Sequence, residues 1–136
     1  MSTEWYLQAF EVEDEQQIPT FEILSLFNEY PIKQSQNYVD LSLPDGDVTI
    51  FVDVQAESIC HLTITRPILS EALYKLIYNI MSTGNFVFYS PGGNYPIILN
   101  ETVREHLPLD MMQALGEPKV GNTPEAFLEL LKNLYA

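Results

Sequence analysis

Residues 37–54 have the sequence NYVDLSLPDGDVTIFVDV. On both sides of the central PDG every second side chain is apolar, which is the period of a β-strand with one buried face. Pro, Asp and Gly are typical turn residues, so the two runs are predicted to form a β-hairpin. The side chains expected to point inward are Val39, Leu41, Leu43, Val48, Ile50, Val52 and Val54.

Residues 58–65, SICHLTIT, continue the same alternation. We expect Cys60, Leu62 and Ile64 to point inward, and Ile59, His61 and Thr63 to point outward. Three successive strands joined by short turns form an antiparallel meander.

The rest of the chain alternates between strand and helix patterns. A first strand is expected over 4–12 and two later strands flank the PGGN turn, while 101–116 contain a short helical region. A helix over 18–30 would bury Phe21, Leu24, Ile23 and Phe27 and end before Pro31. Helices over 70–84, ending at Gly84, and over 123–136, capped by Thr123, complete the pattern. The prediction is one α+β domain, 1–136, with a mostly antiparallel sheet (a central three-strand meander plus a later hairpin) and helices packed on one face.

The composition is strongly acidic, with a net charge of −13. Residues 1–65 carry −11 of this and residues 66–136 carry −2. Direct binding to nucleic acid or to an anionic membrane is disfavoured, because phosphate contacts need Lys and Arg. An acidic surface instead favours a basic partner, although acidity also serves solubility alone. A single cysteine, no apolar run long enough to span a bilayer and no secretion signal favour a cytoplasmic setting.

The sequence offers little support for catalysis. Cys60 is expected to be a buried, structural thiol, and a regular strand would place its neighbour His61 on the opposite face, so the two would form no dyad. His106 has no evident partner in the sequence. Two isolated histidines and one cysteine match no zinc pattern, and the run that begins DGD lacks a complete set of calcium ligands. We therefore predict no catalytic residue, no cofactor and no metal.

One set of side chains indicates a protein interface. The outward face of the meander is expected to carry Phe51 among acids and hydroxyls, and an aromatic anchor with a charged rim is typical of such interfaces. Alternatively, a helix covers this face and Phe51 belongs to the core. The predicted partner-binding residues are Asp40, Asp45, Asp47, Phe51, Asp53 and His61.

Four segments together resemble a known group of proteins. They are LSLPDGDVTIFVDV, the run from SICHLTITRP to NFVFYSPGG, HLPLDMMQALGEP and the final TPEAFLELL. From about Leu41 onward the chain is similar to the small cytoplasmic immunity proteins encoded beside bacterial polymorphic toxins, including those of type VI secretion and contact-dependent inhibition. Contact residues vary widely among such proteins, so the resemblance transfers no site residue.

The resemblance implies a non-catalytic inhibitor that binds a cognate toxin domain tightly. We expect the protein to be a monomer or a weak dimer. The acidic composition fits a basic toxin that acts on nucleic acid or nucleotides. Two alternatives remain open. One is a nucleic-acid-mimicking inhibitor from a mobile element, and the other is a small ligand-binding or enzymatic domain with a pocket near the hairpin from Ser90 to Pro96.

Overall fold

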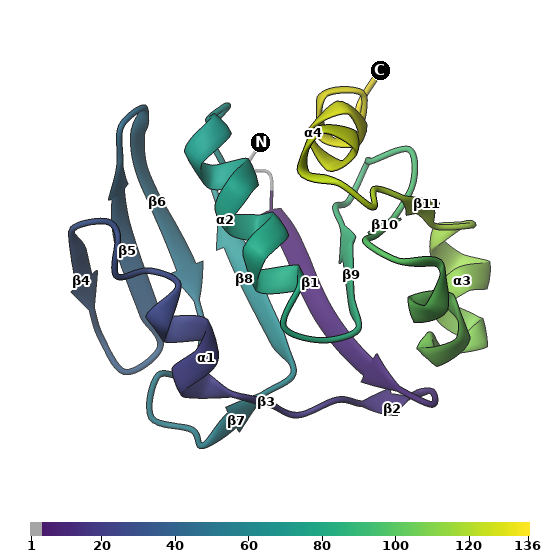
Figure 1. Ribbon diagram of the computed structural model, residues 1–136, viewed down its shortest axis with the longest axis horizontal. Coiled ribbons are helices and arrows are strands. Elements are labelled where there is room, and N and C mark those ends of the chain that lie inside the picture. The colour runs from purple at the N-terminus through teal and green to yellow at the C-terminus, as the bar shows by residue number, and fades with distance from the viewer. Residues whose placement is uncertain (1–3) are drawn as a thin grey trace.

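The computed structural model describes residues 4–136 as an α+β fold (Figure 1). The strands are β1 (Glu4–Glu11), β2 (Asp14–Glu15), β3 (Ile18–Pro19), β4 (Ile32–Gln34), β5 (Tyr38–Leu43), β6 (Gly46–Phe51), β7 (Ser58–Ile59), β8 (His61–Thr65), β9 (Phe86–Tyr89), β10 (Ile97–Ile98) and β11 (Lys119–Val120). The helices are α1 (Thr20–Ser25), α2 (Glu71–Met81), the 3₁₀ helix η1 (Glu101–His106), α3 (Leu109–Leu115) and α4 (Pro124–Lys132).

The main sheet has the order β11-β10-β9-β1-β8-β6-β5-β4, with β2 paired to β1. Strands β5, β6 and β8 form the predicted antiparallel meander, and β9 with β10 forms the predicted later hairpin. Only β10 and β11 pair in parallel within this sheet. The edge strand β4 was not expected from the sequence, because its three residues are all exposed and carry no alternating pattern.

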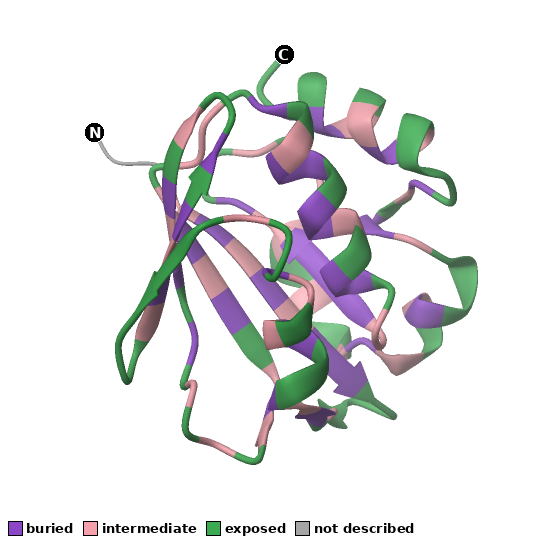
Figure 2. Cartoon of the chain, turned by 60° about the vertical axis from the view of Figure 1, so that its left-hand side comes forward, coloured by how far each residue is buried: buried purple, intermediate pink, exposed green. Residues whose placement is uncertain are grey.

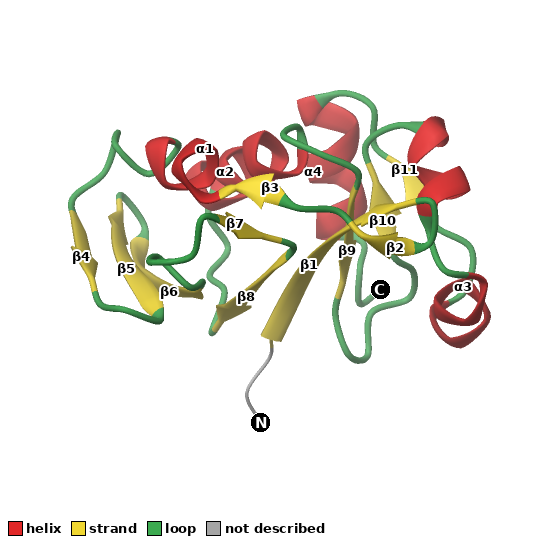
Figure 3. Cartoon of the chain, turned by 90° about the horizontal axis from the view of Figure 1, so that it is seen from below, coloured by secondary structure: helices red, strands yellow, loops and turns green. Residues whose placement is uncertain are grey.

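Helices α1, α2 and α4 lie together on one face of the sheet (Figure 3). The main core forms between them and the strands, and the strand residues that face it alternate with more exposed ones (Figure 2). The predicted inward residues Val39, Leu41, Ile50, Leu62 and Ile64 are all fully buried. The alternation therefore predicted these five buried positions correctly.

The ends of the two long helices follow from their capping residues. The Ser70 hydroxyl accepts a hydrogen bond from the Leu73 N–H, and the Thr123 hydroxyl accepts one from the Ala126 N–H. Such side-chain caps satisfy backbone donors that a helix N-terminus leaves unpaired. Helix α2 ends at Met81, three residues before the expected stop. Gly84 has no positive φ; its lack of a Cβ instead leaves room for the side chain of Ile18.

The helix predicted over 18–30 is much shorter in the structure. Ile18 and Pro19 pair with β7 as a strand, and α1 then covers only Thr20–Ser25. Ile23 and Phe27 are fully buried, whereas Phe21 is 71% exposed. The expectation that Phe21 is buried is therefore wrong, because residues 21 and 23 lie nearly opposite each other around a helix with 3.6 residues per turn.

A second, smaller cluster covers the other face at one end of the sheet. Its buried members are Phe10, Val87, Ile98, Val103 and Leu107, with Met111, Met112 and Val120 packed against them. The register pairs Val87 with Gln8 of β1 and with Ile98, so these side chains point away from the main core. Helices η1 and α3 thus cover the β9–β10 end, and the outer face of the meander remains open.

Candidate functional site

The open face carries a continuous row of side chains across five strands. The pairing register places Tyr89, Tyr6, Thr63, Phe51 and Tyr38 next to one another in that order. Four of the five are aromatic. Their spacing follows from strand pairing, since neighbouring strands lie about 4.8 Å apart. A row of this kind joins residues that are 83 positions apart in the sequence, from Tyr6 to Tyr89.

The aromatic side chains of this row pack in two pairs. The ring centroids of Tyr6 and Tyr89 are 5.2 Å apart, and those of Tyr38 and Phe51 are 5.9 Å apart. Phe51 is 43% exposed and no helix of residues 4–136 covers it, so the alternative that a helix buries Phe51 in the core is excluded. An exposed Phe held by a neighbouring ring is a rigid apolar contact surface.

A second row runs beside the first and carries charge. Its members are Glu4, Thr65, Thr49, Asp40 and Lys33, again in pairing order. Two hydroxyls hold its carboxylates in place. The Thr49 hydroxyl donates to Asp40 Oδ1 at 2.6 Å, and the Tyr6 hydroxyl donates to Glu4 Oε2 at 2.6 Å. The hydrogen bond to Glu4 raises the pKa of Tyr6 above its usual value.

A shallow hollow of about 530 Å³ connects the two rows. It is lined by Glu4, Asp47, Val48, Thr49, Phe51, Thr65 and Arg66. Within residues 4–136, ion pairs form only between Arg104 and the two glutamates Glu101 and Glu117, so the carboxylates of the hollow have no cationic partner within 4 Å. Two basic side chains lie on this face, Lys33 in the second row and Arg66 in the lining of the hollow.

The structure brings together four of the six predicted partner-binding residues. Asp40, Asp47, Phe51 and His61 lie on the outward side of β5, β6 and β8. Asp45 lies at the tip of the β5–β6 turn and is exposed. Asp53 follows the end of β6, where its carboxylate accepts a hydrogen bond from the Gln55 N–H.

Several residues of the site were missed by the sequence analysis, and three of them, Tyr6, Tyr89 and Glu4, lie outside the meander. Each lies on a strand that was predicted, but pairing between β1, β8 and β9 could not be predicted from local patterns. The signal that was present is the alternation in β1, where Tyr6 and Gln8 fall between the buried Trp5, Leu7 and Ala9.

The prediction that Cys60 is buried beside Leu62 and Ile64 is wrong. The third strand is interrupted at Cys60, because β7 ends at Ile59 and β8 begins at His61. Cys60 is consequently half-buried, and Ile59, which was expected to point outward, is buried instead. One irregular residue shifts the alternation by one position, which exchanges the faces on either side of it.

The same irregularity brings Cys60 and His61 together, contrary to the expectation for a regular strand. The Cys60 thiol donates to Glu15 Oε2 at 3.3 Å and lies 3.7 Å from His61 Nδ1. Burial, and then the hydrogen bond to Glu15, raise the pKa of the thiol to about 11. A thiol with this pKa is almost entirely protonated at neutral pH, which opposes a role as a nucleophile.

The second histidine has a partner that the sequence did not reveal. His106 Nδ1 accepts a hydrogen bond from the Val12 N–H at 3.1 Å, and the His106 carbonyl accepts one from the Glu13 N–H at 2.9 Å. Both contacts hold the β1–β2 turn, so His106 has a structural role. Among residues 4–136 no group of three or more His, Cys, Asp or Glu side chains is arranged to hold a metal ion.

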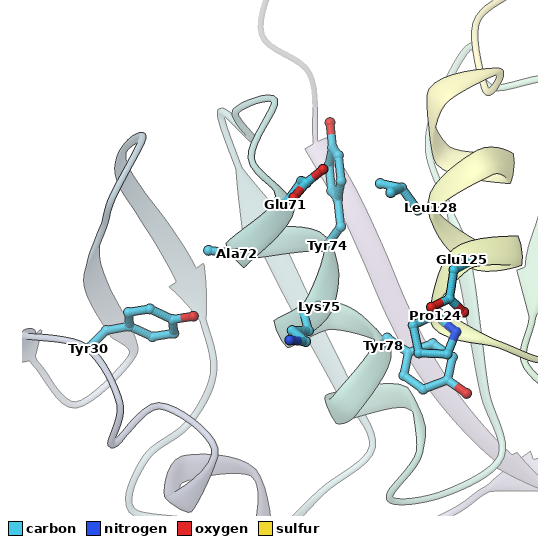
Figure 4. A pocket seen from close by; sticks show the side chains of 9 residues that line it. All are labelled: Tyr30, Glu71, Ala72, Tyr74, Lys75, Tyr78, Pro124, Glu125 and Leu128. Carbon is cyan, nitrogen blue, oxygen red and sulfur yellow. The ribbon is translucent and has the colours of Figure 1, made fainter.

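A different hollow, of about 420 Å³, lies on the helical side of the molecule (Figure 4). Side chains from α2 and α4 and from the segment after α1 form its walls: Tyr30, Glu71, Ala72, Tyr74, Lys75, Tyr78, Pro124, Glu125 and Leu128. The close-up shows Tyr30 standing apart from the other labelled side chains, on the side of α2 away from α4. Within residues 4–136 the one buried side-chain polar atom without a hydrogen-bond partner is Thr20 Oγ1, which does not line this hollow.

The hairpin between Ser90 and Pro96 lines neither of the two hollows described above. It packs instead against the C-terminal segment. The Asn94 N–H donates to the Leu134 carbonyl, and the Ser90 and Tyr135 hydroxyls lie 2.7 Å apart. These contacts give this segment a structural role.

Comparison of the chain with protein-family models, curated proteins and solved structures finds no match. No helix within residues 4–136 combines the length and the apolar character needed to cross a membrane.

Proposed function

We propose that this protein binds and neutralises a cognate toxin domain through the open face of its sheet and has no catalytic activity of its own. The observation that carries the proposal is the exposed Phe51 at the border of an aromatic row and a row of unpaired carboxylates. An apolar centre with a polar rim is the usual anatomy of a protein interface. The resemblance to immunity proteins suggests the same kind of partner.

The charge of the face supports a basic partner. Glu4, Asp40 and Asp47 lie on it, and Asp45 and Asp53 lie at its margins, whereas only Lys33 and Arg66 oppose them. A negative surface accelerates the association of a positive partner, and this acceleration weakens as salt shortens the range of the field to about 8–10 Å. A toxin that acts on nucleic acid or nucleotides has such a positive surface because it contacts phosphates.

The experiment is co-expression with the C-terminal domain of the protein encoded immediately upstream, which the proposal expects to be the toxin, followed by co-purification and a growth assay. We expect a stable complex, restored growth and an association rate that falls as ionic strength rises. Phe51→Ala should increase the dissociation rate, and Phe21→Ala, which removes an exposed Phe from helix α1 on the other face, is the matched control. Neutralisation that is unaffected by Phe51→Ala and by charge reversal at Asp47 would move the interface elsewhere.

The absence of catalysis is tested separately. The purified protein should show no turnover of nucleotides, esters or peptides with or without added divalent metal. A hydrolytic activity that copurifies with the protein and disappears in a His61→Ala or His106→Ala variant would contradict the proposal.

A further inference from the structure

We infer that the open face selects arginine over lysine side chains in its partner, with guanidinium groups stacked on the aromatic row and paired to the carboxylates beside it. This inference rests on the proposed function and names the chemistry that the same face recognises. Two kinds of contact distinguish an arginine from a lysine side chain, namely stacking on flat rings and pairing with fixed carboxylates. The two rows provide one kind each.

The aromatic row suits a planar cation. Phe51 is exposed beside Tyr38, and Tyr6 and Tyr89 form the second pair of the same row. A guanidinium group is planar and more weakly hydrated than an ammonium group, so it stacks on a ring face at a smaller cost of desolvation. An ammonium group gains less from such a row, since it is a compact and strongly hydrated charge.

The carboxylates are held in a way that also favours arginine. Glu4 accepts from Tyr6 through Oε2, and Asp40 accepts from Thr49 through Oδ1. Each donor fixes the orientation of its carboxylate and uses one acceptor site of one oxygen, so both oxygens can still accept a further hydrogen bond. A carboxylate held in one orientation can receive the parallel N–H groups of a guanidinium, which lysine does not have. Asp47 adds a third carboxylate in the hollow beside Phe51.

The two basic residues of the face limit where the partner's cations can bind. Lys33 lies opposite Asp40 in the register at the β4 edge, and Arg66 lines the hollow together with Glu4 and Asp47. Like charges repel, so arginines of the partner are directed to the middle of the row, over Phe51 and Thr63. The occupant is thus a protein surface that presents arginines within the width of the meander.

The test uses the full chain and two soluble probes, an arginine nonapeptide and a lysine nonapeptide of equal charge, at low ionic strength. Affinity is measured by calorimetry, and the binding face is mapped by backbone amide chemical shifts. We expect the arginine peptide to bind about tenfold more tightly, with shifts on β1, β5, β6 and β8. Phe51→Ala should remove most of this preference, Phe21→Ala should leave it unchanged, and Asp47→Asn should weaken both peptides to a similar degree.

Equal affinities for the two peptides, a preference that survives Phe51→Ala, shifts confined to α1, α2 and α4, or no binding of either peptide would each overturn the inference. The toxin co-purification assay distinguishes its failure from that of the proposed function. If the protein neutralises the toxin but binds the two peptides equally, the proposed function stands and the face binds the toxin by charge alone. An arginine preference without toxin binding leaves a specific face whose partner is a different arginine-bearing protein.

Discussion

The two ends of the sheet treat its outer face differently. At the β9–β10 end, η1 and α3 bury Val87 and Ile98 under a second apolar cluster, so both faces are covered. At the meander end, the same face carries Asp40, Thr49 and Phe51 and has no cover. The helical layer is common to both ends. The two ends differ in the side chains that their strands carry on the face away from the helical layer.

The local sequence of the strands accounts for this difference between the two ends. Strand β9, FVFY, has consecutive buried residues, whereas β5, YVDLSL, alternates strictly between buried and more exposed ones. Strands buried on both faces have continuous apolar runs, and strands with one solvated face alternate. The open face is therefore encoded as open, and we interpret its exposed aromatic residue as a contact residue because folding does not require it there.

The largest expected effect is on folding stability, and it differs between the two faces of β6. Ile50→Ala removes a fully buried side chain and should lower the free energy of unfolding by about 2–5 kcal/mol. Phe51→Ala, at the next residue of the same strand, should cost about 1 kcal/mol or less, because its ring is 43% exposed. Denaturant unfolding of the two variants measures both values. Similar losses for the two variants would show that the outer face also contributes to the core.

The second effect concerns binding. Asp47→Lys should weaken the complex with the toxin domain by about 2 kcal/mol if the carboxylate is desolvated in the interface, which is a change of about thirtyfold in Kd. Glu129→Lys makes the same change of charge on the exposed side of α4, across the sheet, and should change Kd by less than about threefold. Equal losses for the two variants would mean that net charge, and not the open face, determines affinity.

Most of the architecture could be predicted from short-range patterns. Alternation predicted β5, β6 and their buried residues, and the capping residues Ser70 and Thr123 predicted where two helices begin. Both signals depend on neighbouring residues along the chain, so they need no knowledge of the fold.

The predictions that failed have a common physical cause. Local patterns allowed more than one arrangement, and tertiary contacts decided between them. In and just after α1, the pair Phe21 and Leu24 and the pair Ile23 and Phe27 both have helical spacing, and packing against the sheet fully buries only the second pair. The aromatic row likewise depends on the pairing of β1 with both β8 and β9, to which no local pattern points. The candidate site could therefore be predicted on the meander, and its extension onto β1 and β9 could not.

A smaller effect is expected at the β1–β2 turn, which the covered end holds in place through η1. Val12 and Glu13 have φ values of 48° and 69°, in the left-handed region that β-branched residues strongly disfavour. The double variant Val12→Asn with Glu13→Gly should stabilise the protein by about 1 kcal/mol, because Asn-Gly adopts this turn with little strain.

His106→Ala provides the matched comparison at this turn. It removes the side-chain acceptor for the Val12 N–H and should destabilise the protein by about 1 kcal/mol. Thermal or denaturant unfolding measures both changes. A double variant that is less stable than the parent would show that the turn is not strained. The contacts from η1 would then not be needed to keep the turn in an unfavourable conformation.

The smallest effect is expected at Cys60, where the alternation between the two faces is interrupted. Because the side chain is half-buried, Cys60→Ala should change the free energy of unfolding by about half a kcal/mol at neutral pH.

The pH dependence of stability is more informative than the effect of this substitution. The thiol pKa is about 11 in the folded protein against an ordinary value of 9.0, so the folded state favours the protonated thiol. This contribution to stability is fully present below about pH 9 and is lost as the pH rises through about 11. Alkylation of the native thiol should accordingly be slow at neutral pH and accelerate toward pH 11, and Glu15→Gln should move that acceleration to lower pH by removing the hydrogen bond that favours the protonated form. Fast alkylation at pH 7 would mean instead that the break between β7 and β8 leaves a reactive thiolate on the open side of the sheet, next to His61, and the non-catalytic interpretation of this face would have to be abandoned.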